Sequence, residues 1–350
     1  MKIFKVIGLM SGTSLDGLDI AYCEFTQKVD GWSFHAGAAC TVSYDKTLKE
    51  QLQNARSYTG NELSKLHVDY GKWTGLQVKK FIDENKMEVD FISSHGHTIF
   101  HQPEIGLTLQ IGDLNHIAAI TQKITIGDFR TLDVALGGQG APLVPIGDEL
   151  LFSAYDNCLN LGGIANVSFH EGGKRLAFDI CPVNIVLNTL VGHFGKNYDD
   201  GGKIASKGKV DSALLQQLSA VEFNQLPAPK SLGIEYIEKH YFPLLNTSAL
   251  SKEDQLSTFV EYIAQSIVAA VKPGSLLVTG GGAKNTFLIE RLKANFKKGD
   301  VVVPEAAVID FKEAIIFAFL GVLRYLNLPN SLASVTGAKR DSSGGVIISV

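Results

Sequence analysis

Short apolar runs and glycine-containing turns alternate along the first part of this chain. Apolar residues dominate 3–10 and 18–25, and a polar stretch with two glycines separates these runs. Two strand-like runs around a small turn predict a β-hairpin. A similar layout recurs at 157–181, where Gly162 and Gly163 separate two apolar runs. This weak repeat predicts two halves, each of which begins with a strand, a glycine turn and a second strand.

Helical periodicity fills much of the remaining sequence. Apolar residues three and four positions apart predict amphipathic helices over 46–60 and 61–85. Two short apolar runs that end in polar residues, 89–96 and 123–130, follow them, and a strand–turn–helix unit spans 275–296. Strands that alternate with helices predict an α/β fold, in which functional residues gather at the carboxyl ends of strands.

The most apolar helix is predicted from about Lys312 to Leu326. Its run Ala314–Leu323 is shorter than the roughly 20 apolar residues that cross a bilayer, so we expect a buried helix rather than a membrane span. The pattern leaves open whether this helix belongs to the core or to a subunit interface. A homodimer therefore stays open as well.

Composition narrows the class of protein. At about 150 residues per domain, 350 residues predict about two domains, and 45% hydrophobic with 19% charged residues argues against disorder. The net charge of -4 excludes a generally basic surface that coats nucleic acid. The N-terminus does not read as a signal peptide, and the four cysteines are widely spaced, so we expect a cytoplasmic protein with free thiols.

Three glycine-rich turns directly follow apolar runs, at 8–17, 162–163 and 280–282. Glycine lets backbone N–H groups approach a phosphate closely. Asp16 could hold Mg²⁺ directly or through water. Each turn alone could be an ordinary hairpin turn, but together they predict a split nucleotide site. The first turn adds hydroxyl donors from Ser11, Thr13 and Ser14.

Common single-loop nucleotide motifs are absent from the sequence. It contains no G-x-x-x-x-G-K-[ST] and no H-R-D catalytic loop, which excludes a P-loop enzyme and a protein kinase. No G-x-G-x-x-G opens a helix after the first predicted strand. Any nucleotide site must therefore be built in another way.

Nine segments together carry a resemblance to one family over essentially the whole chain. They are GLMSGTSLDGLDIA (8–21), SHGHTIFHQP (94–103), GDFRTLDVALGGQGAPLVP (127–145), NLGGIANVS (160–168), YDDGGKIASKG (198–208), PKSLG (229–233), TGGGAKN (279–285), KEAIIFAFL (312–320) and SVTGAKR (334–340). In these segments the chain resembles the anhydro-N-acetylmuramic acid kinases.

The resemblance implies an α/β fold with two ribonuclease-H-like domains of the actin-like ATPase type, flanking a nucleotide cleft. The first domain would comprise 1–130 plus about 335–350 and carry the first phosphate loop. The second would comprise 131–334 and carry the catalytic Asp and the nucleoside-side glycine turn. This expectation agrees with the repeated strand–turn–strand units.

The resemblance also implies an activity. The family uses ATP and Mg²⁺ to open the 1,6-anhydro ring of 1,6-anhydro-N-acetylmuramic acid with water and to phosphorylate O6. The products are N-acetylmuramate 6-phosphate and ADP, and the role is bacterial peptidoglycan recycling. The implied partner is thus a small sugar, with neither nucleic acid nor membrane involved. A kinase for another anhydrosugar such as levoglucosan, and a non-catalytic relative that binds ATP or sugar, remain alternatives.

The family's catalytic base is an Asp in a segment of the form F-D-T-G-P-G-N, which here reads Phe178 to Asn184. Asp179 stands at the position of the base, so the resemblance makes it the group that deprotonates water. The alternative is a helix N-cap after a strand. The departures from the pattern are Ile180, Cys181 and Val183, which we expect to remove a hydrogen bond and to narrow the room beside the sugar.

The remaining expected site residues are carried over from the family's motifs. The first phosphate loop would comprise Gly12, Thr13, Ser14, Leu15, Asp16, Gly17, Leu18 and Asp19. The second would contain Gly162 and Gly163, and the turn beside the nucleoside Gly280, Gly281 and Gly282.

For the sugar, the resemblance points to Arg130, Glu313 and His97. Arg130 could hold a carboxylate such as the lactyl group, or form an ion pair with Asp128 or Asp133. Glu313 could face the sugar or only contribute negative charge to the first turn of a helix.

Histidines and neighbouring acids give two further hypotheses. His97 replaces the Gln of the family's usual S-H-G-Q-T, and together with His95 and His101 it invites a metal interpretation. We favour a polar loop around the sugar, since no acidic or Cys partner lies nearby in the sequence. Asp199 and Asp200 are predicted to be turn residues.

Overall fold

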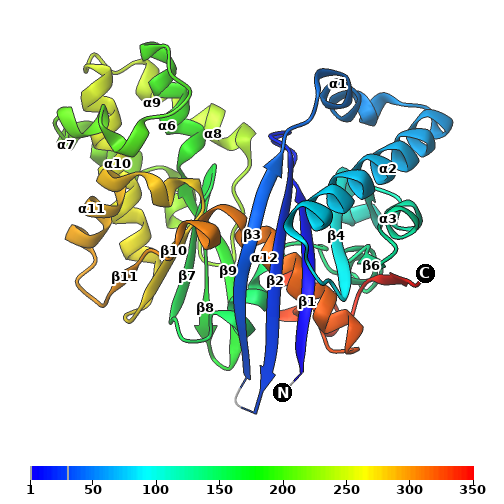
Figure 1. The fold of residues 1–350 in the computed structure, drawn as a ribbon. Helices are drawn as coiled ribbons and strands as arrows, with labels where there is room; N and C mark the ends of the chain where they lie inside the picture. Colours follow the sequence, from blue (N-terminus) through cyan, green and yellow to red (C-terminus); the bar gives the residue numbers. More distant parts are fainter. Residues whose placement is uncertain (1, 30) are drawn as a thin grey trace. The chain divides into compact units, whose positions relative to one another are not determined.

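The computed structural model describes residues 2–29 and 31–350 and divides the chain into two compact units. The first unit comprises Met1–Leu151 with Phe311–Val350, and the second comprises Phe152–Asp310. Residues 131–151 and 311–334, which the sequence analysis placed in the second domain, thus belong to the first unit. Both units combine a sheet with helices (Figure 1).

The first unit is built on a seven-stranded sheet with the order β12-β6-β4-β1-β2-β3, and β5 pairs with β4. β1 runs parallel to β4, and β4 runs parallel to β6, whereas β2 is antiparallel to β1 and β3. The predicted hairpin is therefore confirmed, with Ile3 opposite Thr26 and Ser11 opposite Leu18. The strands are β1 (Ile3–Ser11), β2 (Leu18–Lys28), β3 (Gly31–Val42), β4 (Phe91–Gln102), β5 (Leu107–Ile111), β6 (Ile124–Gly127) and β12 (Val346–Ile348).

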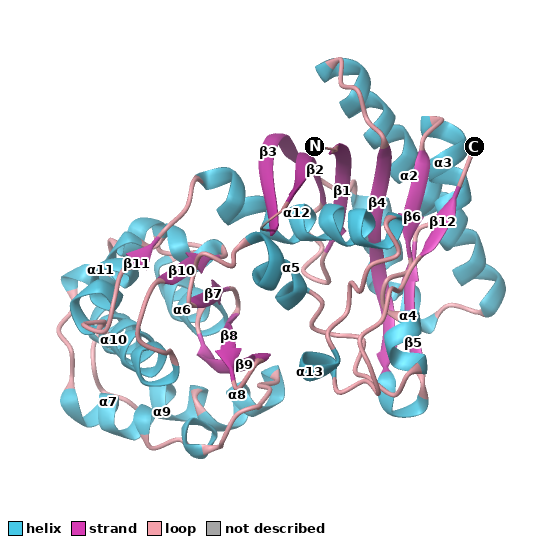
Figure 2. Ribbon diagram, turned by 90° about the horizontal axis from the view of Figure 1, so that it is seen from below, coloured by secondary structure: helices cyan, strands magenta, loops and turns pink. Residues whose placement is uncertain are grey.

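Helices cover both faces of this sheet (Figure 2). On one face, Ile7 and Leu9 of β1 belong to the same apolar cluster as Leu66 and Tyr70 of α2. The predicted helices over 46–60 and 61–85 are α1 and α2, and the capping box of Thr59 with Glu62 starts α2. The helices of the unit are α1 (Lys46–Asn54), α2 (Gly60–Asn85), α3 (Leu114–Thr121), α4 (Thr131–Ala135), α5 (Val144–Leu151), α12 (Ala306–Tyr325) and α13 (Ala333–Thr336).

Helix α12 packs on the opposite face of the sheet. A Cβ at Gly8 would lie 2.0 Å from the Ala314 carbonyl oxygen, so only glycine lets α12 approach β1 this closely. Ala314–Leu323 is buried almost completely, which assigns this helix to the core of the first unit rather than to an exposed interface. The part of α12 that packs on β1, at Ala314 and Ala318, belongs to the first unit, whose second segment begins at Phe311.

Buried hydrogen bonds tie the C-terminal segment to the same unit. The Asp133 carboxylate in α4 accepts from Ser331 Oγ at 2.6 Å and from Thr336 Oγ1 at 2.8 Å. Its other oxygen accepts from the Gly140 N–H at 2.8 Å. Because an unpaired buried carboxylate is costly, these contacts hold residues 131–140 and 331–336 together within the first unit.

The second unit repeats the strand order of the first. Its sheet has the order β11-β10-β7-β8-β9, in which β8 is antiparallel to both neighbours while β7, β10 and β11 are parallel. The strands are β7 (Asn157–Leu161), β8 (Ile164–Glu171), β9 (Lys174–Pro182), β10 (Leu276–Thr279) and β11 (Val301–Val302). In each unit three antiparallel strands are followed by two parallel ones. The expected α/β fold with two ribonuclease-H-like units is thus confirmed.

Helix α10 is the central helix of the second unit and packs against β9, α6, α7 and α11. The predicted strand–turn–helix unit over 275–296 is β10 followed by α11. The helices are α6 (Asn184–Val191), α7 (Ser212–Ser219), α8 (Ile234–His240), α9 (Phe242–Asn246), α10 (Lys252–Ala270) and α11 (Thr286–Asn295). Short 3₁₀ helices span Ala55–Ser57, Pro103–Ile105, Gly192–Phe194, Asp200–Gly202, Ala205–Lys207, Glu222–Gln225 and Gly281–Lys284. Among the described residues, no helix combines the length and apolar character that a membrane span requires.

Candidate active site

The first glycine turn joins β1 to β2 and exposes its polar side chains. Leu15 is buried and has a φ of 59°, and its N–H donates to the Gly12 carbonyl at 3.2 Å. A turn of this kind with exposed hydroxyls can bind phosphate oxygens. The geometry is compatible with the predicted phosphate loop over Gly12–Asp19. The exposed side chains of the turn are Thr13, Ser14 and Asp16.

A buried polar network lies where β1 enters this turn. Ser11 Oγ is 2.7 Å from His97 Nδ1 and 2.6 Å from the Tyr44 hydroxyl, which in turn is 3.0 Å from the Tyr70 hydroxyl. Burial lowers the pKa of His97 to about 4, so the imidazole is neutral at pH 7. His97 is only 3% exposed, and this geometry favours support of the turn over direct contact with a sugar.

Arg130 follows β6 and reaches back to β4. Its Nε donates to His95 Nε2 at 3.0 Å, and Nη1 donates to the Gly140 carbonyl at 2.6 Å. Burial lowers the pKa of Arg130 to about 10, whereas the charges of Glu313 and Asp133 act in the opposite direction. The hydrogen bonds of Arg130 thus go to His95 and Gly140, while Asp133 is occupied by the C-terminal segment.

Glu313 lies on α12 just after Phe311, where the backbone departs from helical angles. Its side chain is reached by solvent, yet the surrounding protein desolvates the carboxyl and raises its pKa. The positive charge of Arg130 lowers this pKa and the negative charge of Asp19 raises it. The fold thus brings Arg130, Glu313 and Asp19 into one electrostatic neighbourhood within the first unit.

The metal interpretation of the histidines is not supported by the fold. Within residues 2–29 and 31–350, no three His, Cys, Asp or Glu side chains come together as a metal-binding group. His95 and His97 lie inside strand β4 rather than in the loop that the sequence analysis expected. Mg²⁺ favours one or two carboxylates together with phosphate oxygens and water. The exposed carboxylate of Asp16 beside two hydroxyls fits that donor set.

In the second unit, the third glycine turn packs against the end of β7, directly before the second glycine turn. A Cβ at Gly280 would lie 2.5 Å from Asn160 Oδ1, and one at Gly282 would lie 2.7 Å from Leu161 Cβ. The Gly163 carbonyl accepts from Val183 N–H at 2.8 Å. Glycine at 280 and 282 therefore lets the turn after β10 approach the end of β7 closely.

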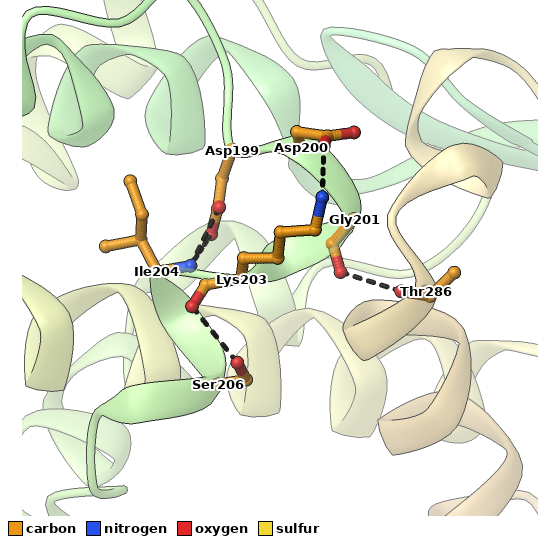
Figure 3. Close-up of polar contacts among 7 residues, drawn as sticks. All are labelled: Asp199, Asp200, Gly201, Lys203, Ile204, Ser206 and Thr286. Carbon is orange, nitrogen blue, oxygen red and sulfur yellow. Dashed lines mark hydrogen bonds and ion pairs between the residues drawn. The ribbon is translucent and has the colours of Figure 1, made fainter.

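A loop between α6 and α7 supports the third glycine turn (Figure 3). Thr286 at the start of α11 donates its hydroxyl to the Gly201 carbonyl at 2.8 Å. Asp199 accepts from the backbone N–H of Ile204 at 2.8 Å, and Asp200 forms an ion pair with Lys203. Asp199 precedes and Asp200 begins the short 3₁₀ helix Asp200–Gly202, where a turn was predicted, and this loop contacts the start of the helix that follows Gly280–Gly282.

Asp179 lies inside β9, opposite Asn166 of β8. Its Oδ2 accepts from Leu232 N–H at 2.8 Å and from Ser231 Oγ at 3.3 Å, and its own N–H donates to the Lys230 carbonyl at 2.9 Å. Burial raises the pKa of the carboxyl, and these two donors partly oppose the rise. Helix α6 begins only at Asn184, after the N-cap position Val183, so the N-cap alternative for Asp179 is wrong.

The departures from the family's pattern are packed into the protein. Ile180, Cys181 and Val183 are each at most 3% exposed and belong to the apolar core of the second unit. Burial raises the pKa of the Cys181 thiol far above its usual range, which makes it a poor nucleophile. Ile180 also lines a cavity together with Phe178 and Lys230, so the expected narrowing beside the sugar stays a prediction.

Sequence reasoning missed several residues that shape the candidate site residues within each unit. His95 was considered only as a metal ligand, although it is the hydrogen-bond partner of Arg130. Ser231 and the Leu232 N–H were seen only as part of the segment PKSLG. Asn160 was not singled out at all. The position of His95 and Ser231 inside family-like segments was the one signal that could have drawn attention to them.

Two sheets of ribonuclease-H-like order, each with a glycine turn after its first strand, define a protein of the actin-like ATPase and sugar kinase class. A model of the anhydro-N-acetylmuramic acid kinase family matches residues 4–350. The chain belongs to this family, whose membership makes it a kinase and implies the use of ATP.

Two relatives of the same family name agree with this assignment. The anhydro-N-acetylmuramic acid kinase of Mannheimia succiniciproducens is 36% identical, covering 97% of this chain and 98% of the relative. That of Coxiella burnetii is 37% identical, covering 98% and 97%. Among solved structures, component A of the Acidaminococcus fermentans (R)-2-hydroxyglutaryl-CoA dehydratase covers 90% of this chain and 96% of its own, at 10% identity and a TM-score of 0.45. A ROK family glucokinase from Streptomyces griseus, solved with glucose and AMPPNP, covers 90% and 98% at 11% identity and a TM-score of 0.39.

Proposed function

We propose that this kinase hydrolytically opens the 1,6-anhydro ring of 1,6-anhydro-N-acetylmuramic acid and phosphorylates O6 with ATP. Water adds to the anomeric carbon, the bond from that carbon to O6 breaks, and O6 takes the γ-phosphoryl group. The products are N-acetylmuramate 6-phosphate and ADP. The names of the 35–37% identical relatives support this substrate.

The geometry of Asp179 is the observation that carries the proposal. One carboxylate oxygen is fixed by Ser231 and Leu232, while Oδ1 has no hydrogen bond from the residues that the structure describes. Burial raises the pKa of the group, which makes the carboxylate a stronger base than an exposed Asp. A fixed carboxylate with one available oxygen can take a proton from a water molecule.

The second requirement is to stabilise the negative charge of the phosphoryl group during its transfer. The first turn offers backbone N–H groups and the hydroxyls of Thr13 and Ser14, and the glycine turns of the second unit offer further backbone donors. Asp16 would hold Mg²⁺, which when bound supplies positive charge at the phosphates. Arg130 and Glu313 are the proposed sugar contacts, with Arg130 facing the lactyl carboxylate.

A biological role follows from this substrate. Anhydromuramic sugars arise from cell-wall turnover, so the proposed role is peptidoglycan recycling in a bacterium. ATP is available in the cytoplasm, where we place the enzyme. Three of its cysteines are buried and Cys40 is half-buried, and thiols stay reduced in that compartment.

The substrate is tested by measuring ADP release with Mg-ATP and three additions: 1,6-anhydro-N-acetylmuramic acid, levoglucosan or no sugar. Release that depends on the muramic sugar supports the proposal. Preference for levoglucosan would contradict it and assign a different anhydrosugar kinase. ATP binding without sugar-dependent release from either compound would indicate a non-catalytic relative.

Asp179→Asn tests the base directly. We expect kcat to fall about 10²- to 10⁴-fold, because the amide cannot accept the proton. The folded protein should survive the change: the pKa of Asp179 is raised on folding, so ionisation of this group costs stability as pH rises through the folded pKa, and Asn removes that cost at pH 7. The melting temperature should therefore be retained.

Asp83→Asn is the matched control, since Asp83 lies on α2 with 63% of its side chain exposed. This variant should keep the wild-type kcat. Normal turnover by Asp179→Asn would sink the assignment of the base.

A further inference from the structure

His95 occupies an unusual place for a titratable side chain. It lies inside β4 and is only 4% exposed. Its ring stands 4.5 Å from the ring of Phe317 on α12. The proposed chemistry assigns no role to His95, yet a buried polar side chain needs hydrogen-bond partners.

The partners of His95 determine where its proton resides. Arg130 Nε can only donate, so the Nε2 atom at 3.0 Å must be the acceptor. Nδ1 then carries the proton and donates to the Gly96 carbonyl at 2.9 Å. Burial and the positive charge of Arg130 hold the pKa of His95 well below its usual range, against the opposing effect of the Gly96 and Ser11 carbonyls, so the ring is neutral.

The same contacts orient the guanidinium of Arg130. Nε is held by His95 and Nη1 by the Gly140 carbonyl. Nη2 donates to no acceptor among the residues that the structure describes, which leaves donor capacity for a ligand oxygen. The guanidinium carbon also lies 5.9 Å from the Phe317 ring centre. Arginine side chains are long and flexible, so three such contacts reduce the ordering cost of binding.

Helix α12 carries Glu313 and Phe317 on the same face. Glu313 and Phe317 are four residues apart and therefore lie on the same face of the helix. Phe317 lies beside both His95 and Arg130, and Glu313 interacts electrostatically with Arg130. The titratable groups around Arg130 are Glu313, Asp133 and His101, and burial and Arg130 itself lower the pKa of His101.

We propose that His95 is a positioning residue that fixes Arg130 so that its remaining donor nitrogen meets the carboxylate of the sugar. The inference rests on the proposed function for the identity of that carboxylate. It makes His95 a determinant of specificity, since a sugar without the carboxylate gains nothing from an oriented Arg130. His95 itself does not contact the reacting atoms.

The first test is calorimetric binding without turnover. We expect His95→Leu to weaken binding of 1,6-anhydro-N-acetylmuramic acid about 10- to 100-fold, and to leave binding of the same sugar without its lactyl group unchanged. His95→Gln, which retains an acceptor, should recover part of the loss. The matched control is His35→Leu, an exposed position on β3, which should bind both sugars like the wild type.

A double-mutant cycle with Arg130→Leu distinguishes an effect of His95 on the position of Arg130 from a general disturbance of the fold. If His95 acts through Arg130, the double variant binds the muramic sugar no more weakly than Arg130→Leu alone. Additive losses would overturn the inference. Wild-type protein that binds neither sugar would instead refute the proposed substrate.

The second test needs no ligand. In ¹⁵N spectra of histidine-labelled protein, His95 should remain neutral with its proton on Nδ1 between pH 5 and 8. A proton on Nε2 would exclude the hydrogen bond from Arg130 and overturn the inference, whatever the sugar experiments show.

Discussion

At the scale of single residues, the environment of Asp179 determines at which pH the proposed base can work. The base acts as a carboxylate, so kcat/KM falls as pH drops through its pKa. Burial raises this pKa, and the hydrogen bond from Ser231 lowers it. In the profile of kcat/KM against pH, the fall on the acid side therefore lies at higher pH than an exposed Asp would give. The hydrogen bonds from Ser231 and Leu232 determine how far it is shifted.

Ser231→Ala should move the acid side of the kcat/KM profile to higher pH. The substitution removes a donor to the carboxylate, which raises the pKa of Asp179 further. Turnover at pH 8 should remain near that of the wild type, whereas turnover near pH 5 should fall. The measurement is kcat/KM from pH 4.5 to 9.

Ser219→Ala serves as the control, because its hydroxyl donates to the Leu215 carbonyl within α7 and not to the base. Its profile should coincide with that of the wild type. A shift of the Ser231→Ala profile to lower pH would contradict the proposed role of this hydrogen bond.

Residue by residue, the sequence predicted those parts of the candidate site that motifs carry. The turns at Gly162–Gly163 and Gly280–Gly282 are examples. It did not predict the contact of His95 with Arg130, because that pair is 35 positions apart in sequence and depends on how β4 and β6 pair. Likewise, the burial of Ile180 and Cys181 depends on the bulge in β9 and on the helices packed behind it.

At the scale of elements, the contact of β1 with α12 sets the geometry beneath the first turn. The apolar runs predicted both elements, but composition alone could not show that they meet at a glycine. For strand β4 the difference between prediction and structure is larger. The apolar run was predicted to end near Gly96, but the strand continues to Gln102 because β5 pairs with its second half. Such pairing is non-local and leaves only a weak trace in the sequence.

Gly8→Ala should destabilise the protein by about 1–3 kcal/mol or more, because the added methyl overlaps the Ala314 carbonyl and approaches Ala318 Cβ at 2.8 Å. Urea unfolding measures the loss. Gly60→Ala at the start of α2 meets nothing within 4 Å and should be neutral or stabilising by up to about 1 kcal/mol. Equal stability of the two variants would show that α12 can shift away from β1.

At the scale of the whole molecule, the two units differ in how the chain builds them. The second unit is one continuous segment, 152–310, with its own apolar core. The first unit needs 311–350 to cover one face of its sheet and to satisfy Asp133. The sequence analysis expected a C-terminal return only from about 335, since nothing in the pattern around 311 marks a change of unit.

A fragment of residues 152–310 should therefore fold alone and melt cooperatively, whereas 1–151 should not. Circular dichroism melts of both fragments test this. Adding a 311–350 polypeptide to 1–151 should restore a cooperative transition. Cooperative melting of 1–151 by itself would show that α12 is dispensable for the first sheet.

Because the first unit consists of two separate segments of the chain, the two units are completed at different times during synthesis. A ribosome makes β1 to β6 first, then the 159 residues of 152–310, and only afterwards the helix that covers the sheet. At about 5–20 residues per second, that interval lasts about 8–30 s. The nascent protein therefore completes its later unit first, and the earlier sheet remains open to chaperones or to neighbouring chains until synthesis is nearly finished.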